Sequence, residues 1–318
     1  MKMMRALFTL GPYAGLIAAA IAAYYLFPSN LGFVTTVVVA MIFVLSLDLV
    51  MGVAGISTLG HAALYGTGAY AAAIFATLVS ADPLLGLAVG AGAGAAIAFV
   101  SGLFLMRAQG LTLLMLSIAV TEVLSSLANK YSGLTGGADG LSFTPGALFG
   151  RFEFDFYGQL GYIYAVCVFL VVFGMLRIVV ASPFGLTARG IKESPARMRA
   201  IGTPVYWRLV SVYTFAGAIA GLAGALGAQS TALVSLNVYD FQRSAEAVIM
   251  LIIGGTGRLW GAVIGTIVFM TVHQVAASAD PFNWLFVIGA LVLAVVYIVP
   301  AGLLGLPEMV KKLTGGAR

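Results

Sequence analysis

The chain has 318 residues, of which 61% are hydrophobic and only 8% are charged, whereas charged residues make up about a quarter of a typical soluble domain. This composition excludes a soluble globular protein and predicts an all-α polytopic membrane protein that forms one transmembrane domain over residues 1–318. The formal net charge of +5 does not indicate nucleic-acid binding, because the basic residues gather in one loop and at the two ends, as the positive-inside rule describes.

The N-terminal region carries Lys2 and Arg5 and continues as an apolar run. That run extends for about 20 residues, which exceeds the roughly 7 to 15 apolar residues of a secretory signal peptide. We therefore expect a retained first membrane helix rather than a cleaved leader.

A membrane-spanning helix needs about 20 predominantly apolar residues. By this criterion the sequence predicts about ten transmembrane segments. They cover residues 7–27, 31–51, 58–80, 83–106, 110–128, 157–180, 208–228, 240–257, 258–279 and 283–305.

The distribution of charge predicts the orientation of these segments. If both termini are cytoplasmic, alternation places Arg107 and the basic loop at 181–207 inside, and Asp82 and the loop at 129–156 in the periplasm. The stretch 177–208 holds six of the sixteen basic residues and one acid, Glu193. We therefore expect the 181–207 loop to face the cytoplasm.

Two stretches rich in glycine interrupt this pattern, GVAGIST at 52–58 and GGTGRLW at 254–260. Interrupted or re-entrant membrane helices contain such stretches, provided that the irregular backbone lines a protein cavity. Close packing between helices is the alternative reason for glycine, as for GAGAGAA at 90–96.

The basic loop contains the signals of a short helix at 195–201, between the sixth and seventh segments. Ser194 is a good N-cap and Pro195 suits the first helical position. Gly202 can end the helix in a left-handed turn. On a helical period Met198 and Ile201 share one side while Arg199 lies on the other. The helix could dock into a soluble partner, or the loop could lie on the anionic membrane surface.

Several stretches resemble a known family. The loop SPFGLTARGIKESPARMRAIG is similar to the cytoplasmic loop of ABC-importer permeases, in which a short helix followed by glycine sits in a cleft of the ATP-hydrolysing subunit. Five stretches in order resemble the LivM-type permeases of branched-chain amino acid ABC transporters. They are GVAGISTLGHAALYGTGAYAAA (52–73), GLTLLMLSIAVTEVL (110–124), SGLTGGADGL (132–141), the loop with TFAGAIAGLAGAL (214–226), and LIIGGTGRLWGAVIG (251–265).

The resemblance implies a multi-pass permease of the bacterial inner membrane, with no cofactor of its own. It would pair with a second homologous permease, two ATP-binding subunits that hold ATP and magnesium, and a periplasmic substrate-binding protein. The sequence carries no GxxxxGK[ST] phosphate loop. The sequence departs from the family at KESP, where an acid and asparagine are more common. The coupling residues that the resemblance implies are Ser194, Pro195, Arg197, Met198, Arg199, Ile201 and Gly202.

Ionisable residues at membrane depth are costly and are functional candidates by default. Glu122 matches an acid common in the family, and Asp48 falls where the family usually has asparagine. The structural alternative for Glu122 is an ion pair or hydrogen bond with a neighbouring helix, and Asp48 could be a buried protonated acid. His61 follows Ser57, Thr58 and Gly60, and these four could border the translocation path; a histidine that links two helices is the alternative for His61. One histidine with no second nitrogen or sulfur ligand nearby does not indicate a metal site.

No catalytic motif is present, so an enzyme is not expected. The sequence favours an ABC-importer permease for branched-chain amino acids. The alternatives are the same machinery with urea, short amides or aromatic acids as cargo, or a proton-coupled secondary transporter that uses Asp48, His61 and Glu122 as relay groups.

Overall fold

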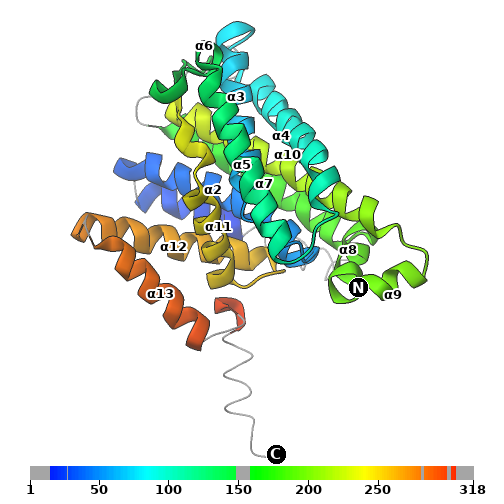
Figure 1. Ribbon diagram of the computed structural model, residues 1–318. Coiled ribbons are helices and arrows are strands. Elements are labelled where there is room, and N and C mark those ends of the chain that lie inside the picture. The colour runs from blue at the N-terminus through cyan, green and yellow to red at the C-terminus, as the bar shows by residue number, and fades with distance from the viewer. Residues whose placement is uncertain (1–14, 27, 148–157, 281–282, 299–301, 306–318) are drawn as a thin grey trace, which may run out of the picture.

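The structure is a computed structural model that describes residues 15–26, 28–147, 158–280, 283–298 and 302–305. It is built almost entirely of helices (Figure 1). The predicted all-α polytopic membrane class is therefore confirmed. The predicted features at residues 1–14, 148–157 and 306–318 lie outside the described residues.

The first half of the chain contains η1 (Pro28–Asn30), α2 (Leu31–Leu47), the π-helical turn η2 (Asp48–Val53), α3 (His61–Leu78), α4 (Pro83–Leu105), α5 (Leu111–Lys130), α6 (Ser132–Thr135), η3 (Gly137–Asp139) and β1 (Leu141–Ser142). The second half contains α7 (Gln159–Ala181), α8 (Pro183–Glu193), α9 (Pro195–Ala200), α10 (Val205–Thr231), β2 (Leu233–Val234), η4 (Leu236–Tyr239), α11 (Phe241–Gly254), α12 (Leu259–Ala279), α13 (Trp284–Ile298) and η5 (Leu303–Gly305). The two strands pair antiparallel, with Leu141 opposite Val234.

Six helices are long and apolar enough to cross a membrane: Leu31–Val53, Pro83–Leu105, Leu111–Lys130, Gln159–Ala181, Val205–Thr231 and Leu259–Ala279. Each matches a predicted segment to within three residues at either end. Gly15–Leu26 and Trp284–Val295 are shorter apolar helices, and α3 and α11 are not among the six. The count of ten spans and the cytoplasmic placement of the termini stay predictions.

The core is centred on α10, which packs against α2, α3 and α4. Gly90 and Gly94 of α4 lie directly against Gly217 and Gly221 of α10, so closely that a Cβ atom added to any of them would overlap the opposite helix. Glycines four residues apart on both helices allow this approach, which is the packing device of membrane helices. The packing interpretation of the stretch 90–96 is thus confirmed for Gly90 and Gly94, whereas Gly92 has no neighbour among the described residues within 4 Å of an added Cβ.

Both glycine stretches do interrupt helices, as the sequence predicts. Residues 54–60 are not helical between η2 and α3, and residues 255–258 are not helical between α11 and α12. Left-handed backbone at Gly55 (φ 74°) and Gly257 (φ 80°) requires glycine at both breaks. The two breaks, about 200 residues apart in the chain, lie against each other.

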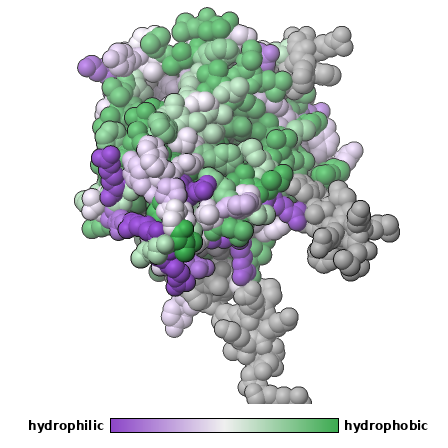
Figure 2. Space-filling view, turned by 90° about the vertical axis from the view of Figure 1, so that its right-hand side faces the viewer, coloured by the Kyte–Doolittle hydropathy of each residue, from purple (hydrophilic) through white to green (hydrophobic). Residues whose placement is uncertain are grey.

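The predicted loops sort to two ends of the bundle. Arg107 lies over the ring of Tyr206 at 5.9 Å, which places the α4–α5 turn beside the basic loop. At the other end the Gly146 amide donates to the Ala81 carbonyl at 2.8 Å. This grouping agrees with alternation of the segments. Figure 2 shows hydrophilic side chains gathered at the height of α8 and α9, below a mostly hydrophobic surface.

Candidate functional site

The helix α9 forms where the sequence predicts it, with both of its caps. The Ser194 hydroxyl accepts a hydrogen bond from the Arg197 amide at 3.3 Å, and Pro195 opens the helix. At the other end the Gly202 amide donates to Arg199 O and the Thr203 amide to Met198 O, both at 3.0 Å. With φ at 84°, Gly202 completes a Schellman motif.

No residue of α9 is buried in this chain. Ile201 leaves 70% of its side chain exposed, whereas Met198 is half-buried and its sulfur lies against Gly190 of α8. The two side chains that share one side of the helix therefore differ: Met198 joins α9 to α8, and Ile201 is available to another molecule.

The end of α8 reaches into the first glycine break. The Lys192 ammonium group donates to the Gly52 carbonyl at 2.7 Å. Its side-chain stem lies on the backbone of Gly55, where an added Cβ would come within 2.7 Å of Lys192 Cγ. A small cavity of about 210 Å³ lies here, bounded by residues 54–57, the α4–α5 turn, Lys192 and Pro195.

Asp48 ties the two glycine breaks together from inside the protein. Its side chain is fully buried, and one carboxylate oxygen accepts a hydrogen bond from the Gly257 amide at 2.6 Å. Within the part of the chain that the structure describes, the second oxygen has no hydrogen-bond partner. Gly52 lies between them, and an added Cβ would overlap Asp48 and the Gly257 amide. We call Asp48, Gly52, Gly55 and Gly257 the glycine junction.

The segment after this junction is held by hydroxyl groups from three helices. Ser46 of α2 lies 2.8 Å from His61 Nε2. Ser117 of α5 accepts from the Leu59 amide at 3.2 Å, and Ser244 of α11 accepts from the Ala62 amide at 2.9 Å. The His61 side chain is fully buried, so it does link α2 to α3, as the structural alternative holds.

The other residues predicted to border the path fall into two groups. Thr58 is buried and accepts from the Gly60 amide at 3.2 Å. Gly60 is buried against the Ser117 backbone. Ser57 is exposed and borders the 210 Å³ cavity. Glu122 stands apart from all of them on α5. The structure thus gathers Asp48 and residues 57–61 near the glycine junction and separates Glu122.

Glu122 is exposed on the side of α5 that faces away from the rest of the chain. The buried positions of this helix are Leu113, Ser117, Thr121 and Ala128. On the opposite side lie six exposed residues at alternating spacings of three and four, hereafter the α5 stripe: Thr112, Met115, Ala119, Glu122, Ser126 and Asn129. The stripe carries the only carboxyl group of this helix.

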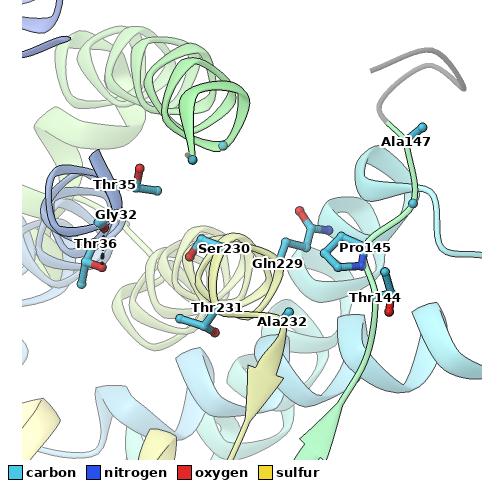
Figure 3. Close-up of a pocket in the computed structure, with 13 residues that line it drawn as sticks. Gly32, Thr35, Thr36, Thr144, Pro145, Ala147, Gln229, Ser230, Thr231 and Ala232 are labelled. Carbon is cyan, nitrogen blue, oxygen red and sulfur yellow. Dashed lines mark hydrogen bonds between the residues drawn. The ribbon is translucent and has the colours of Figure 1, made fainter. Parts of the chain in front are cut away.

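A larger cavity of about 660 Å³ opens at the opposite end from α9 (Figure 3). Thr35 and Thr36 of α2, Thr144, and Gln229, Ser230 and Thr231 of α10 contribute its polar side chains. Among the residues that the structure describes, none that lines the cavity is ionisable. These residues can form hydrogen bonds with a small solute but offer it no charged partner.

Sequence patterns miss the contacts of Lys192, Ser117 and Ser244. Lys192 is one of several basic residues in its loop, and each serine is an ordinary small residue of an apolar helix. Only the fold shows that their partners are backbone groups 140, 58 and 182 residues away. No local signal identifies them.

Comparison with known proteins assigns the chain to a class. A family model described as "Branched-chain amino acid transport system / permease component" matches residues 29–296. The chain is 24% identical over 305 residues to the high-affinity branched-chain amino acid transport system permease protein LivM of Escherichia coli K12, covering 89% of this chain and 72% of the relative. It is 25% identical over 326 residues to the LivM protein of Salmonella typhimurium LT2, covering 93% and 75%. No solved structure matches the chain.

Proposed function

The chain belongs to the family of branched-chain amino acid transport system permease components, and on that basis we propose that it is the membrane-spanning half of an ATP-driven importer of the bacterial inner membrane. In this proposal two ATP-binding subunits act on it from the cytoplasm. A second homologous permease completes the path, and a periplasmic binding protein delivers the solute.

The observation that carries the ATP-driven mechanism is the state of α9. The six-residue helix has both caps satisfied and no buried residue, and it contacts α8 through Met198. It is flanked by α8 and α10, so a force applied to it is passed to two longer helices. Such a capped, exposed helix suits docking into a soluble subunit better than a span within the bilayer. We place Ser194, Pro195, Arg197, Met198, Arg199, Ile201 and Gly202 at this contact.

The α5 stripe supports a translocation path shared with a second permease. A charged group in the middle of a span costs about 2.5–3.5 kcal/mol if it faces lipid. Glu122 is exposed in this chain, so the stripe would face either water or another protein. A helix bearing alternating spacings of three and four suits packing against another helix. We therefore propose that the second permease covers this side of α5 and that Glu122 borders the path between them.

The proposed cargo is a small zwitterion with an aliphatic side chain, leucine, isoleucine or valine, and the LivM relatives are named for the transport of such amino acids. In the proposed orientation the 660 Å³ cavity opens toward the periplasm. Its uncharged polar lining suits a solute released from a binding protein.

Uptake by the assembled complex tests the proposal. The chain, its second permease and the ATP-binding subunits are reconstituted in vesicles, and labelled leucine is presented with the binding protein. We expect uptake that requires hydrolysable ATP and is competed by isoleucine and valine. If only urea, short amides or aromatic acids compete with the labelled solute, the cargo belongs to one of these classes instead. Uptake by the chain alone, driven by a pH gradient without ATP, would overturn the importer.

A further inference from the structure

We propose that Lys192 is the positioning residue through which α9 acts on the glycine junction during the ATP-driven cycle; this inference rests on the proposed function. Lys192 lies three residues before Pro195, the first residue of α9. Its ammonium group bonds the Gly52 carbonyl at 2.7 Å. A displacement of α9 is therefore passed to the backbone of a membrane span through one hydrogen bond.

Both the stem and the ammonium group of Lys192 make contacts through which a displacement of α8 can reach the glycine junction. Its stem lies on Gly55, where left-handed backbone and the absence of a side chain leave room for it. Its ammonium group is fixed by an ordered backbone carbonyl. Lys192 is otherwise exposed, but hydrogen bonds from charged donors are stronger than neutral ones, so this contact resists separation of α8 from Gly52.

From Gly52 the contact continues to the second break. Gly257 approaches Gly52 so closely that an added Cβ would come within 3.0 Å of the Gly52 carbonyl oxygen. The Gly257 amide is bonded to Asp48 at 2.6 Å. Movement of the Gly52 carbonyl therefore shifts the turn between α11 and α12 as well as the end of α2.

The position of the contact supports a role in coupling rather than in stability alone. Non-helical backbone is the part of a membrane bundle that can move without breaking a helix. The Lys192 stem contacts one such segment at Gly55, and its ammonium group bonds Gly52 in the π-helical turn that precedes this segment. The rest of α8 is anchored by Gly185, Ala188 and Ile191, which are buried. The bundle thus holds α8 by these residues, and Lys192 contacts the non-helical backbone at Gly55.

The test measures leucine uptake per ATP hydrolysed by the reconstituted complex. Lys192→Met keeps the apolar stem on Gly55 and removes the donor, so we expect ATP hydrolysis within about twofold of the wild type and uptake per ATP lowered about tenfold or more. Lys192→Arg keeps a charged donor, so this variant should retain most of the leucine uptake per ATP hydrolysed. Lys130→Met, at an exposed lysine at the end of α5, is the matched control and should leave the ratio unchanged.

Gly55→Ala tests the same contact by changing the residue on which the Lys192 stem lies. The added methyl group would displace the Lys192 stem and strain the left-handed backbone, so we expect the same loss of uptake per ATP. If Lys192→Met fails to assemble, this variant decides the question.

A wild-type ratio in Lys192→Met, or in Gly55→Ala where that variant stands in, would overturn the role of Lys192. Loss of ATP hydrolysis together with uptake would also overturn it, because Lys192 would then serve docking and not transmission. Absence of ATP-dependent uptake in the wild type and in Lys130→Met would instead overturn the proposed function.

Discussion

The Asp48 side chain is fully buried, and its hydrogen-bond partner is the Gly257 amide. The carboxylate accepts from this amide at 2.6 Å, and an asparagine oxygen could accept the same bond at the same length of side chain. This hydrogen bond is a contact that joins the two glycine breaks, and an asparagine at position 48 could keep it.

We expect Asp48→Asn to leave unchanged the apparent melting temperature of the purified protein and the uptake by the assembled complex. In Asp48→Ala the free energy of unfolding should fall by about 1–3 kcal/mol, because the Gly257 amide is left buried without an acceptor. Thermal unfolding in detergent checks both variants. An alanine variant as stable as the asparagine variant would show that the bond contributes nothing; an inactive but stable asparagine variant would show that the charge is used.

Gly202 has empty space around it, and its constraint is its backbone. Within the described parts of the chain no atom lies within 4 Å of an added Cβ, but φ is 84°, which costs a residue with a side chain about 1–2 kcal/mol. We expect Gly202→Val to abolish ATP-dependent uptake while membrane insertion persists, because the cap of α9 is lost at its contact with the ATP-binding subunit.

Gly158 provides the matched control for this variant. It has φ of 70° and, like Gly202, no close neighbour, since its nearest contact would be the Gly32 amide nitrogen at 3.9 Å. Gly158→Val introduces the same strain at the other end of the bundle, but Gly158 also lines the 660 Å³ cavity, so binding of the ATP-binding subunits is compared rather than uptake. Gly158→Val should retain this binding and Gly202→Val should lose it. Equal binding in the two variants would remove Gly202 from the coupling contact.

At the scale of the element, α9 was predictable and the glycine junction was not. Serine, proline and glycine act on the residues next to them, so the sequence predicts both caps of α9 and its length to within one residue. The junction instead joins Asp48 to an amide 209 residues away. Apolar periodicity marks the glycine breaks as interruptions, but it carries no information on which interruptions meet.

The N-cap of α9 gives a test at this scale. Ser194→Ala removes the acceptor for the Arg197 amide and should weaken the helix by about 1 kcal/mol. Because α9 buries nothing, the melting temperature should stay unchanged. Amide hydrogen exchange across residues 195–200 should accelerate, and Ser194→Asp should restore protection. Unchanged exchange in Ser194→Ala would show that the helix does not depend on this cap.

The α5 stripe gives a second test at this scale. Single cysteines replace Ala119, Glu122 or Ser126 of the stripe in a Cys167→Ser background, since Cys167 is the native thiol and is exposed. Control cysteines replace Leu116, Val123 and Leu127, which are exposed apolar residues on the adjacent side of α5.

If the stripe borders an aqueous path, its cysteines should react with a membrane-impermeant thiol reagent in the assembled complex, and leucine should slow the reaction. The control cysteines should react far more slowly because lipid excludes the reagent. Equal reaction rates of the stripe cysteines and the control cysteines would contradict an aqueous path along α5.

At the scale of the whole molecule, the order of the spans follows from apolar length and the positive-inside rule, because both act on every segment alike. Six predicted segments are recovered as long apolar helices. Segments that the bundle encloses, such as α3 with its many alanines and glycines, are read less well from hydropathy, because packing against protein replaces contact with lipid.

The central claim is that an ATP-hydrolysing subunit grips α9, and a crosslink from its exposed end tests this most directly. A photoreactive residue is placed at Ile201, which is 70% exposed, and in a control at Leu134 of α6, which is 52% exposed at the other end of the bundle. In the assembled transporter we predict a crosslink to the ATP-binding subunit from position 201 and none from position 134. A crosslink to that subunit from position 134, with none from position 201, would contradict both the coupling contact and the orientation of the chain.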